Sequence, residues 1–287
     1  MSLTFYIVDV FAEEKYAGNQ LAVVRGGADL PDETLQKIAL EMNYSETTFV
    51  LSEEEIDGGY DVRIFTPGGE VPFAGHPTLG TAYVIQHEIL AGPVESITLK
   101  LKAGEIPVTF GDVLWMHQLP PTFGMTLDPA SVAGMLHLER ADLDDHYPIQ
   151  EVSTGLPALI VPLKNLDALQ RCRVHHDRYL ELVENIEAKN ILVFCPEPHE
   201  RSDLSARMFA PGLGVSEDPA TGSANGCLAG YLVEHRYFGT GSIDVQVEQG
   251  YEIGRPSLLY LQAEKKDDET TVHVGGKVQM VATGELV

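Results

Sequence analysis

Two segments of the chain repeat each other, and this repeat limits the available folds more than any other feature of the sequence. Residues 63–68 read RIFTPG and residues 207–212 read RMFAPG, at a spacing of 144 residues. Further along, GHPTLGTA at 75–82 matches DPATGSAN at 218–225 with a slip of one residue. Because the matches occur in the same order in both halves, they indicate two copies of one structural unit.

Each copy leads from the repeated loop into a segment that we predict to be a buried helix. From about Thr78 and from about Thr221 onward, the residues are apolar or small on nearly every face of a helix. Such a helix belongs inside a protein rather than on its surface. Apolar residues at helical spacing predict further helices, with one polar face, at 33–42 and 178–187.

Segments rich in β-formers surround these helices in the sequence. Alternation of apolar and polar residues is clearest at 97–103 and 243–249 and is typical of half-buried strands. GNQLAVV at 18–24 also echoes GLPALIV at 155–161, in the order that the repeat requires. Further strands are predicted at 3–10, 21–25, 47–52, 61–66, 189–195, 258–263 and 270–283.

The repeat and the strand pattern together predict an α+β fold of two similar domains related by a pseudo-twofold axis. Each domain would be a curved, mostly antiparallel β-barrel closed around one central helix. We expect residues 1–118 plus about 277–287 in the N-terminal barrel and 119–276 in the C-terminal barrel, with the final strand returning to the first. QLPPTFG at 118–124 would cross between the domains.

The charge of the chain excludes several classes of partner. Forty-three acidic and 19 basic residues give a formal net charge of -24, which repels the phosphates of nucleic acids and anionic lipids. No apolar run approaches the roughly 20 residues that cross a bilayer, so we expect neither a nucleic-acid nor a membrane partner. An N-terminus without a basic segment and three cysteines outside any C-x-x-C pair are typical of a cytoplasmic protein.

A small anion is the ligand that the repeated loops favour. The loops are rich in glycine, threonine and serine, and each leads into a helix whose free backbone N–H groups carry about half a positive charge. If the two copies pair about a twofold axis, both helix ends face one cavity and hold a carboxylate without lysine. Gly75, Gly222 and Ser223 would let the backbone approach this ligand closely.

Three side chains near these loops are candidates for proton transfer, namely Glu46, His76 and Asp218. Glu46 begins an apolar strand, where partial burial would raise its pKa and let it give and take a proton near neutrality. The alternative for Glu46 is a solvated acid at a strand start. Asp218 could instead cap the following helix, and His76 could instead be a turn residue.

Two other groups of residues carry weaker signals. Cys227 follows the second loop and is either a thiol catalyst or a small packed residue. His175, His176 and Asp177 are adjacent rather than spaced along one face, which is typical of an exposed helix start and unlike a metal site. We therefore expect no metal.

Several segments together resemble the PhzF family of phenazine-biosynthesis-like isomerases. They are NYSETTFV at 43–50, FTPGGEVPFAGHPTLGT at 65–81 and EDPATGSA at 217–224, with DVFAEEKYAGNQLAVV at 9–24, EQGYEIGRPS at 248–257 and VGGKVQMVATGEL at 274–286. The resemblance covers almost the whole chain. It implies the diaminopimelate-epimerase-like fold, with the active site between two related domains, and a homodimer.

The resemblance also implies a role for each candidate residue. The glutamate of the SET motif, Glu46, would be the acid/base that shuttles the proton. His76, Asp218 and Ser223 would position the substrate and relay charge, while Gly75 and Gly222 would supply backbone contacts. In the epimerases of this fold each loop offers a cysteine as a base. The matching places here hold Gly75 and Asp218, which argues against racemisation by two thiols.

The reaction implied by the resemblance moves a proton from C3 to C1 of trans-2,3-dihydro-3-hydroxyanthranilate, a small anionic carboxylate, without a cofactor or metal. Two positions depart from the family pattern. Gln20 stands where proline is expected, and Tyr44 stands beside the proton path where leucine is commoner. The sequence leaves open whether these two residues alter the specificity of the pocket. The alternatives are an epimerase or lyase using the same glutamate on another small acid, and a binding protein that performs no chemistry.

Overall fold

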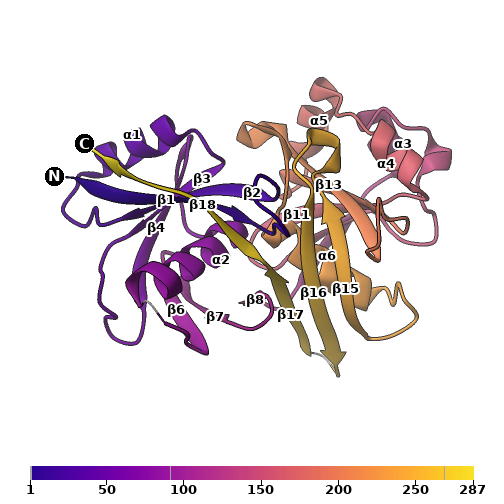
Figure 1. Ribbon diagram of the computed structural model, residues 1–287. Coiled ribbons are helices and arrows are strands. Elements are labelled where there is room, and N and C mark those ends of the chain that lie inside the picture. The colour runs from indigo at the N-terminus through magenta and orange to yellow at the C-terminus, as the bar shows by residue number, and fades with distance from the viewer. Residues whose placement is uncertain (1, 91, 268) are drawn as a thin grey trace. The chain divides into compact units, whose positions relative to one another are not determined.

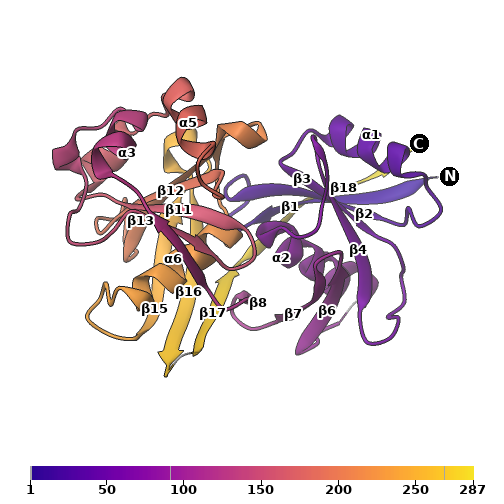
Figure 2. The same ribbon diagram turned by 180° about the vertical axis from the view of Figure 1, so that it is seen from behind.

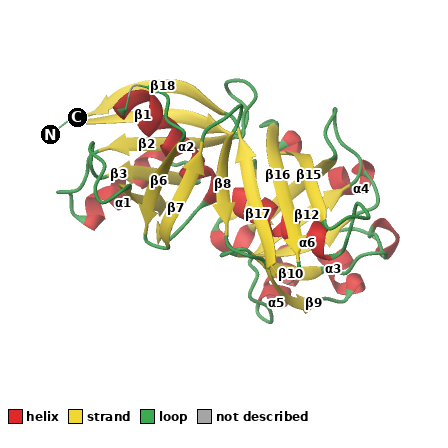
Figure 3. Cartoon of the chain, turned by 90° about the horizontal axis from the view of Figure 1, so that it is seen from below, coloured by secondary structure: helices red, strands yellow, loops and turns green. Residues whose placement is uncertain are grey.

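The computed structural model describes residues 2–90, 92–267 and 269–287. The chain divides into two compact units, the first made of Met1–His117 with Gly275–Val287 and the second of Gln118–Val274. Strands dominate both units (Figure 3), with comparatively few helices, so the fold is of the mixed α/β kind. No helix in the described residues is both long and apolar enough to span a bilayer.

The first unit is a sheet in which antiparallel and parallel neighbours alternate from β1 to β7. β1 pairs antiparallel with β2 and with the last strand of the chain, β18. β2 then pairs parallel with β3, β3 antiparallel with β4, β4 parallel with β6, and β6 antiparallel with β7. The strands are β1 Leu3–Val10, β2 Asn19–Arg25, β3 Glu46–Val50, β4 Tyr60–Thr66, β5 Gly69–Val71, β6 Ser96–Leu101, β7 Gly104–Thr109, β8 Leu114–Gln118 and β18 Val278–Leu286.

Helix α2, Gly75–Val84, lies against the strands of this sheet (Figure 1) and contacts β1, β2 and β3. All of its residues except Tyr83 are buried, and it continues into a π-helical turn at Ile85–Ile89. Gly80 is required at its centre, because a Cβ there would lie 2.6 Å from a methyl of Leu21. Helix α1, Asp32–Met42, covers another part of the sheet and forms a small core with β3 and β4.

The second unit repeats this order of strand pairing. β10 pairs antiparallel with β11, β11 parallel with β12, β12 antiparallel with β13, β13 parallel with β15, and β15 antiparallel with β16. The strands are β9 Thr122–Thr126, β10 Gln150–Ser153, β11 Pro157–Pro162, β12 Asn190–Cys195, β13 Leu204–Ala210, β14 Val215–Asp218, β15 Ser242–Gln249, β16 Ser257–Lys266 and β17 Glu269–Gly276. β9 pairs with β10.

Helix α6, Gly222–Glu234, takes the place of α2 in this unit. Its residues are buried up to Val233, and it contacts β10, β11, β12, β15 and β16 (Figure 2). Three short helices pack with the sheet around a second core: α3 Pro129–Met135, α4 Leu166–Arg171 and α5 His176–Val183. Single 3-10 turns occur at Arg140–Asp142, Pro211–Leu213 and Tyr251–Ile253.

Buried helices are present at both places where the sequence predicted them, with one shift. α6 begins directly after Thr221, as expected, whereas α2 begins at Gly75 rather than near Thr78. The earlier start is allowed because Pro77 lies in the first helical turn, where a missing N–H costs no intrahelical bond. The helix predicted at 178–187 is α5, which begins earlier and ends at Val183, where the Asn185 amide bonds back to the Glu181 carbonyl.

Candidate functional site

Glu46 and His76 come together in the first unit through strand β2. Glu46 is the first residue of β3 and pairs with Leu21 of β2. His76 is the second residue of α2, and its imidazole bonds to the backbone of Gln20, next to Leu21. The His76 Nε2 atom lies 3.5 Å from the Glu46 Oε2 atom. The two candidates for proton transfer in this unit are therefore neighbours.

Burial fixes the charge state of the imidazole. His76 is 4% exposed, and its burial lowers its pKa from 6.5 to about 3, against a smaller opposing effect of the Gln20 backbone bond. The ring is therefore neutral at physiological pH and carries one proton. Its Nε2 atom makes no hydrogen bond within the described residues, so the proton is on the nitrogen that donates to Gln20. The Nε2 lone pair then faces the Glu46 carboxyl.

Neither central helix has its first turn capped by its own N-cap side chain. The N-cap residues are Ala74 for α2 and Thr221 for α6, and neither makes a side-chain capping bond. Both helices begin with glycine, Gly75 and Gly222, and both glycines are buried. Backbone N–H groups in the first turn of a helix can donate to a small anion when no side chain caps them.

The structure corrects the alignment of the two loops. When the helix starts are matched, Gly75 corresponds to Gly222 and His76 to Ser223. Thr78 and Asn225 then also correspond, because each donates a side-chain bond to its N-cap carbonyl. Asp218 has a different place from His76, since it ends strand β14 and precedes the helix by a short loop. The two residues do not occupy equivalent positions.

Asp218 is held in the second unit by a short hydrogen bond. Its side chain is buried, and its Oδ2 atom accepts a bond of 2.5 Å from the Thr221 hydroxyl. Ser223, the second residue of α6, is buried as well. The second unit therefore offers a carboxylate and a hydroxyl near the start of α6, while the first offers an imidazole at the start of α2 and the Glu46 carboxyl of β3.

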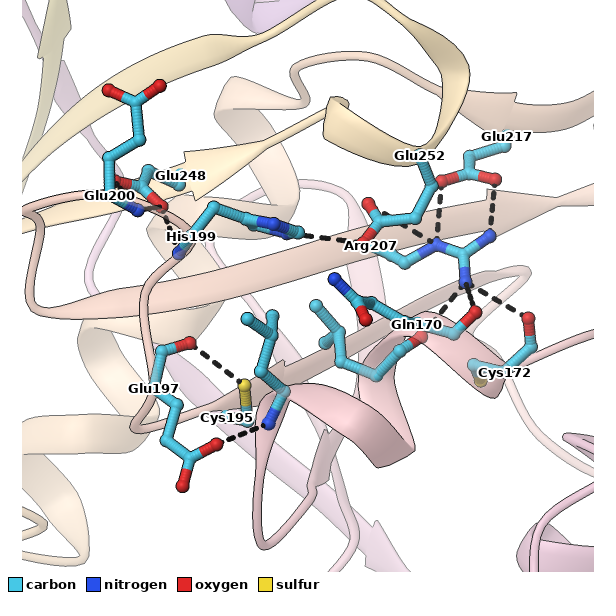
Figure 4. A network of polar contacts seen from close by, with 12 residues as sticks. Gln170, Cys172, Cys195, Glu197, His199, Glu200, Arg207, Glu217, Glu248 and Glu252 are labelled. Atoms are coloured by element: carbon cyan, nitrogen blue, oxygen red, sulfur yellow. Dashed lines mark hydrogen bonds and ion pairs between the residues drawn. The ribbon is translucent and has the colours of Figure 1, made fainter.

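A network of charges fixes the strand that carries Asp218 (Figure 4). Arg207 on β13 forms two bonds of 2.8 Å to the carboxylate of Glu217, the residue before Asp218. Glu252 lies 3.8 Å from the same guanidinium and 3.2 Å from the His199 ring. Because all four side chains are largely buried, this network restrains the end of β14.

The three thiols are poorly suited to proton transfer or nucleophilic attack. Cys172, Cys195 and Cys227 are all free and buried. Burial raises the pKa of Cys172 to about 12 and of Cys195 to about 11, and it raises the pKa of Cys227 as well. A thiol that stays protonated is a poor nucleophile and base. Cys227 is therefore a packed residue that bonds to Thr154 and to the Leu156 carbonyl.

The sequence signal at 175–177 is a helix start. His175 is the N-cap of α5, and His176 and Asp177 form its first turn. Among the residues that the structure describes, no group of three His, Cys, Asp or Glu side chains is placed to hold a metal ion.

Two glutamines at the second loop were missed by the sequence analysis. Gln249 ends β15 and contacts the Asp218 loop, and Gln118 donates to the Gly222 carbonyl. Gln118 lies in QLPPTFG and Gln249 in EQGYEIGRPS, two segments that the sequence analysis singled out, but nothing in either segment marks the glutamine for a role. Their contacts in the fold identify these two residues.

The sequence model of one family, described as phenazine biosynthesis-like protein (PhzC-PhzF), matches residues 8–284. The chain belongs to this family. A relative in Pseudomonas aeruginosa, named trans-2,3-dihydro-3-hydroxyanthranilate isomerase, is 36% identical over 98% of each chain. Because the chain belongs to this family and has this identity to a named isomerase, it is an isomerase.

Solved structures of PhzF proteins have the same fold. A phenazine biosynthesis protein of the PhzF family from Bacillus anthracis is 29% identical, with a TM-score of 0.91 over 100% of this chain and 99% of its own. A predicted epimerase from Pseudomonas aeruginosa is 34% identical, with a TM-score of 0.81 over 99% of both chains.

Proposed function

We propose that the protein is a cofactor-independent isomerase that moves one proton on a small cyclic carboxylate. The observation that carries the proposal is the Glu46 carboxyl, 3.5 Å from a buried neutral imidazole. The first substrate to test is trans-2,3-dihydro-3-hydroxyanthranilate, which the name of the Pseudomonas aeruginosa relative indicates.

Glu46 would carry the proton. Its carboxylate takes the proton from C3 of the substrate, and the electron pair left on carbon is delocalised towards C1. The same carboxyl then gives the proton to C1, so the product is an isomer and no co-reactant is consumed. The Nε2 lone pair of His76 can accept a hydrogen bond from protonated Glu46, whereas it repels the Glu46 carboxylate. It thus favours the stage of the reaction at which Glu46 holds the proton. His76 therefore makes Glu46 a stronger base.

Residues of both units would act on this substrate. Backbone N–H groups at Gly75, Gly222 and Ser223 would hold its carboxylate, which an acidic protein needs because it has few cations to offer. Asp218 would orient the substrate through a donor group such as its amine or hydroxyl. The resemblance to the family supports these roles, and the uncapped helix starts of the two units are consistent with them.

Three wider features belong to the same proposal. Each unit would be a barrel around its central helix and a copy of one ancestral unit, which the matching order of strand pairing supports. The protein would form a homodimer, which sedimentation equilibrium tests. It would act in the cytoplasm, which the three free thiols support.

The test is the Glu46→Gln variant in deuterated water, followed by NMR. Glutamine keeps the shape of the side chain but is neither an acid nor a base near neutrality, and general acid–base catalysis contributes about 10²–10⁴-fold. We expect kcat to fall by about this factor while KM changes little. Wild-type product should carry deuterium at C1 to the extent that the proton on Glu46 exchanges with solvent before it is returned. Near wild-type turnover by the variant would refute the mechanism.

Asp218→Asn serves as the comparison, because Asp218 orients the substrate and does not carry the proton. We expect a smaller loss of turnover than for Glu46→Gln. Wild-type protein that is inert to this substrate would refute the substrate assignment alone. Deuterium that returns to the carbon from which the proton left would instead indicate an epimerase.

A further inference from the structure

Gln249 is a buried side chain that no catalytic role described above uses. It ends strand β15 and is 1% exposed. Its Nε2 atom donates 2.8 Å to the backbone carbonyl of Asp218 and 3.3 Å to the Thr221 hydroxyl. Its Oε1 atom accepts 2.8 Å from Asn225 and 3.4 Å from the Thr221 backbone N–H. One side chain thus contacts both ends of the loop between β14 and α6.

Two backbone partners fix the direction of every bond around this amide. The Asp218 carbonyl can only accept and the Thr221 N–H can only donate, so Nε2 must face Asp218 and Oε1 must face Thr221. Asn225, which is fully buried on the first turns of α6, donates to Oε1 and is consistent with that orientation. The Gln249 amide therefore has a single orientation.

This orientation determines what the Thr221 hydroxyl does. Its oxygen accepts the Gln249 N–H, so its one proton is available for the Asp218 carboxylate, to which it donates at 2.5 Å. A hydroxyl whose oxygen accepts a hydrogen bond becomes a stronger donor. The chain of bonds runs in one direction, from Gln249 through Thr221 to Asp218, and it favours the ionised form of the carboxylate.

We propose that Gln249 is a positioning residue that acts through Thr221 to keep Asp218 ionised and oriented as a hydrogen-bond acceptor. The inference rests on the proposed function for its catalytic consequence. It also narrows the substrate, because the group that faces Asp218 must then be a donor such as an amine or a hydroxyl. A second carboxylate or a carbonyl on the substrate would not bind there.

The first experiment needs no substrate. The Asp218 carboxyl is titrated by ¹³C NMR in protein labelled at aspartate, with its signal assigned by its loss in Asp218→Asn. Gln249→Met keeps the length of the side chain and removes both bonding atoms. We expect the Asp218 pKa to rise by about half a unit or more in this variant, because the Thr221 hydroxyl donates less strongly. An unchanged titration would overturn the proposal.

A double-mutant cycle tests whether the effect passes through Thr221. Thr221→Val removes the hydroxyl and is also expected to raise the Asp218 pKa. Adding Gln249→Met to Thr221→Val should raise it little further, because the relay is already broken. If the effects of the two substitutions on the Asp218 pKa simply add, Gln249 does not act through Thr221, and the proposal is contradicted.

Asn190 supplies the matched control for stability. It is a buried amide on β12 of the same unit, and it donates to the Pro157 carbonyl, away from the loop. Asn190→Ala should lower the unfolding temperature without moving the Asp218 titration. If Asn190→Ala moves the titration as much as Gln249→Met does, the role of Gln249 is merely structural.

Turnover is the second readout, and it separates this inference from the proposed function. With trans-2,3-dihydro-3-hydroxyanthranilate, Gln249→Met should lower kcat/KM about tenfold and shift the acidic limb of its pH profile upward, as Asp218 takes up a proton more readily. Wild-type protein inert to this substrate would refute the proposed function while the titration still decides the role of Gln249. A fall in kcat/KM without a shift of the profile would count against it.

Discussion

Each unit has an arginine at the same place in the repeat. In the first unit this arginine contacts the start of a covering helix, and in the second it contacts the end of one. Arg63 on β4 and Arg207 on β13 each grip one carboxylate with Nε and Nη2, and each lies about 5 Å from the ring of the phenylalanine two residues on. The third contact differs. Nη1 of Arg63 donates to Asp32 at the start of α1, whereas Nη1 of Arg207 donates to the Cys172 carbonyl at the end of α4.

The difference in burial follows from these partners. The side chain of Arg63 is 24% exposed and that of Asp32 is 79% exposed, whereas the side chain of Arg207 is 4% exposed. A guanidinium can satisfy the free carbonyls at a helix end from inside the protein, but an aspartate at a helix start remains in water. The repeated motif therefore specifies the bidentate pair between arginine and glutamate. The contact with the covering helix decides how deeply that pair is buried, and so how much it contributes to the free energy of unfolding.

The largest effect expected from this comparison is on the stability of Arg207→Met. The substitution leaves the carboxylates of Glu217 and Glu252 buried without their cation. Breaking a buried pair in this way costs about 3–5 kcal/mol. Urea unfolding followed by circular dichroism should show a loss of this size.

Arg63→Met is the matched substitution in the first unit. Its partners keep access to water, so the loss of unfolding free energy should be clearly smaller. Equal losses in the two variants would break the comparison, because burial of the arginine would then not decide its contribution.

A second contrast concerns pH, because His76 in the first unit corresponds to the non-titrating Ser223 in the second. Burial keeps the pKa of His76 at about 3 in the folded state, against 6.5 in the unfolded chain. Between these values the unfolded chain binds the extra proton, so this contribution to stability is present above pH 6.5 and is lost as the pH falls. By pH 4.5 the loss should reach about 2–3 kcal/mol.

Chemical unfolding at pH 7 and pH 4.5 measures this loss, with His76→Gln for comparison. The variant should lose less stability between the two pH values than the wild type does, by about the amount given above. If both proteins lose stability in parallel, other groups cause the acid sensitivity and His76 does not contribute to it. Ser223→Ala should follow the wild type.

The smallest effect is expected on the activity of Ser223→Ala. The variant keeps the backbone N–H at the start of α6 and loses one hydroxyl, and a hydrogen bond contributes about 0.5–1.5 kcal/mol. In steady-state kinetics kcat/KM should fall about tenfold or less. A loss as large as that of Glu46→Gln would mean that the second helix start also moves the proton.

Periodicity and repetition predicted much of the fold. The strands at 3–10 and 243–249 and the helix at 33–42 follow from patterns that burial imposes on every sheet or helix. The short helices α3 and α4 were not predicted, because six or seven residues contain too few turns to show a period.

The candidate site was predicted less completely. Glu46 and His76 are neighbours because both lie beside β2, which follows from parallel pairing of strands far apart in sequence. Gln249 could not be found, since its role depends on the directions of four hydrogen bonds. The sequence also aligned Asp218 with Gly75, because matching letters cannot detect a longer loop before the second helix.

The pairing of β18 with β1 has a consequence for how the chain is made. Leu3 pairs with Leu286, so the first unit needs a strand that is synthesised after the whole of the second unit. The second unit is continuous from Gln118 to Val274 and can fold while that strand is still missing. Since domains generally fold as units during translation, the order of folding is reversed relative to the sequence. The unit that carries Glu46 is completed last.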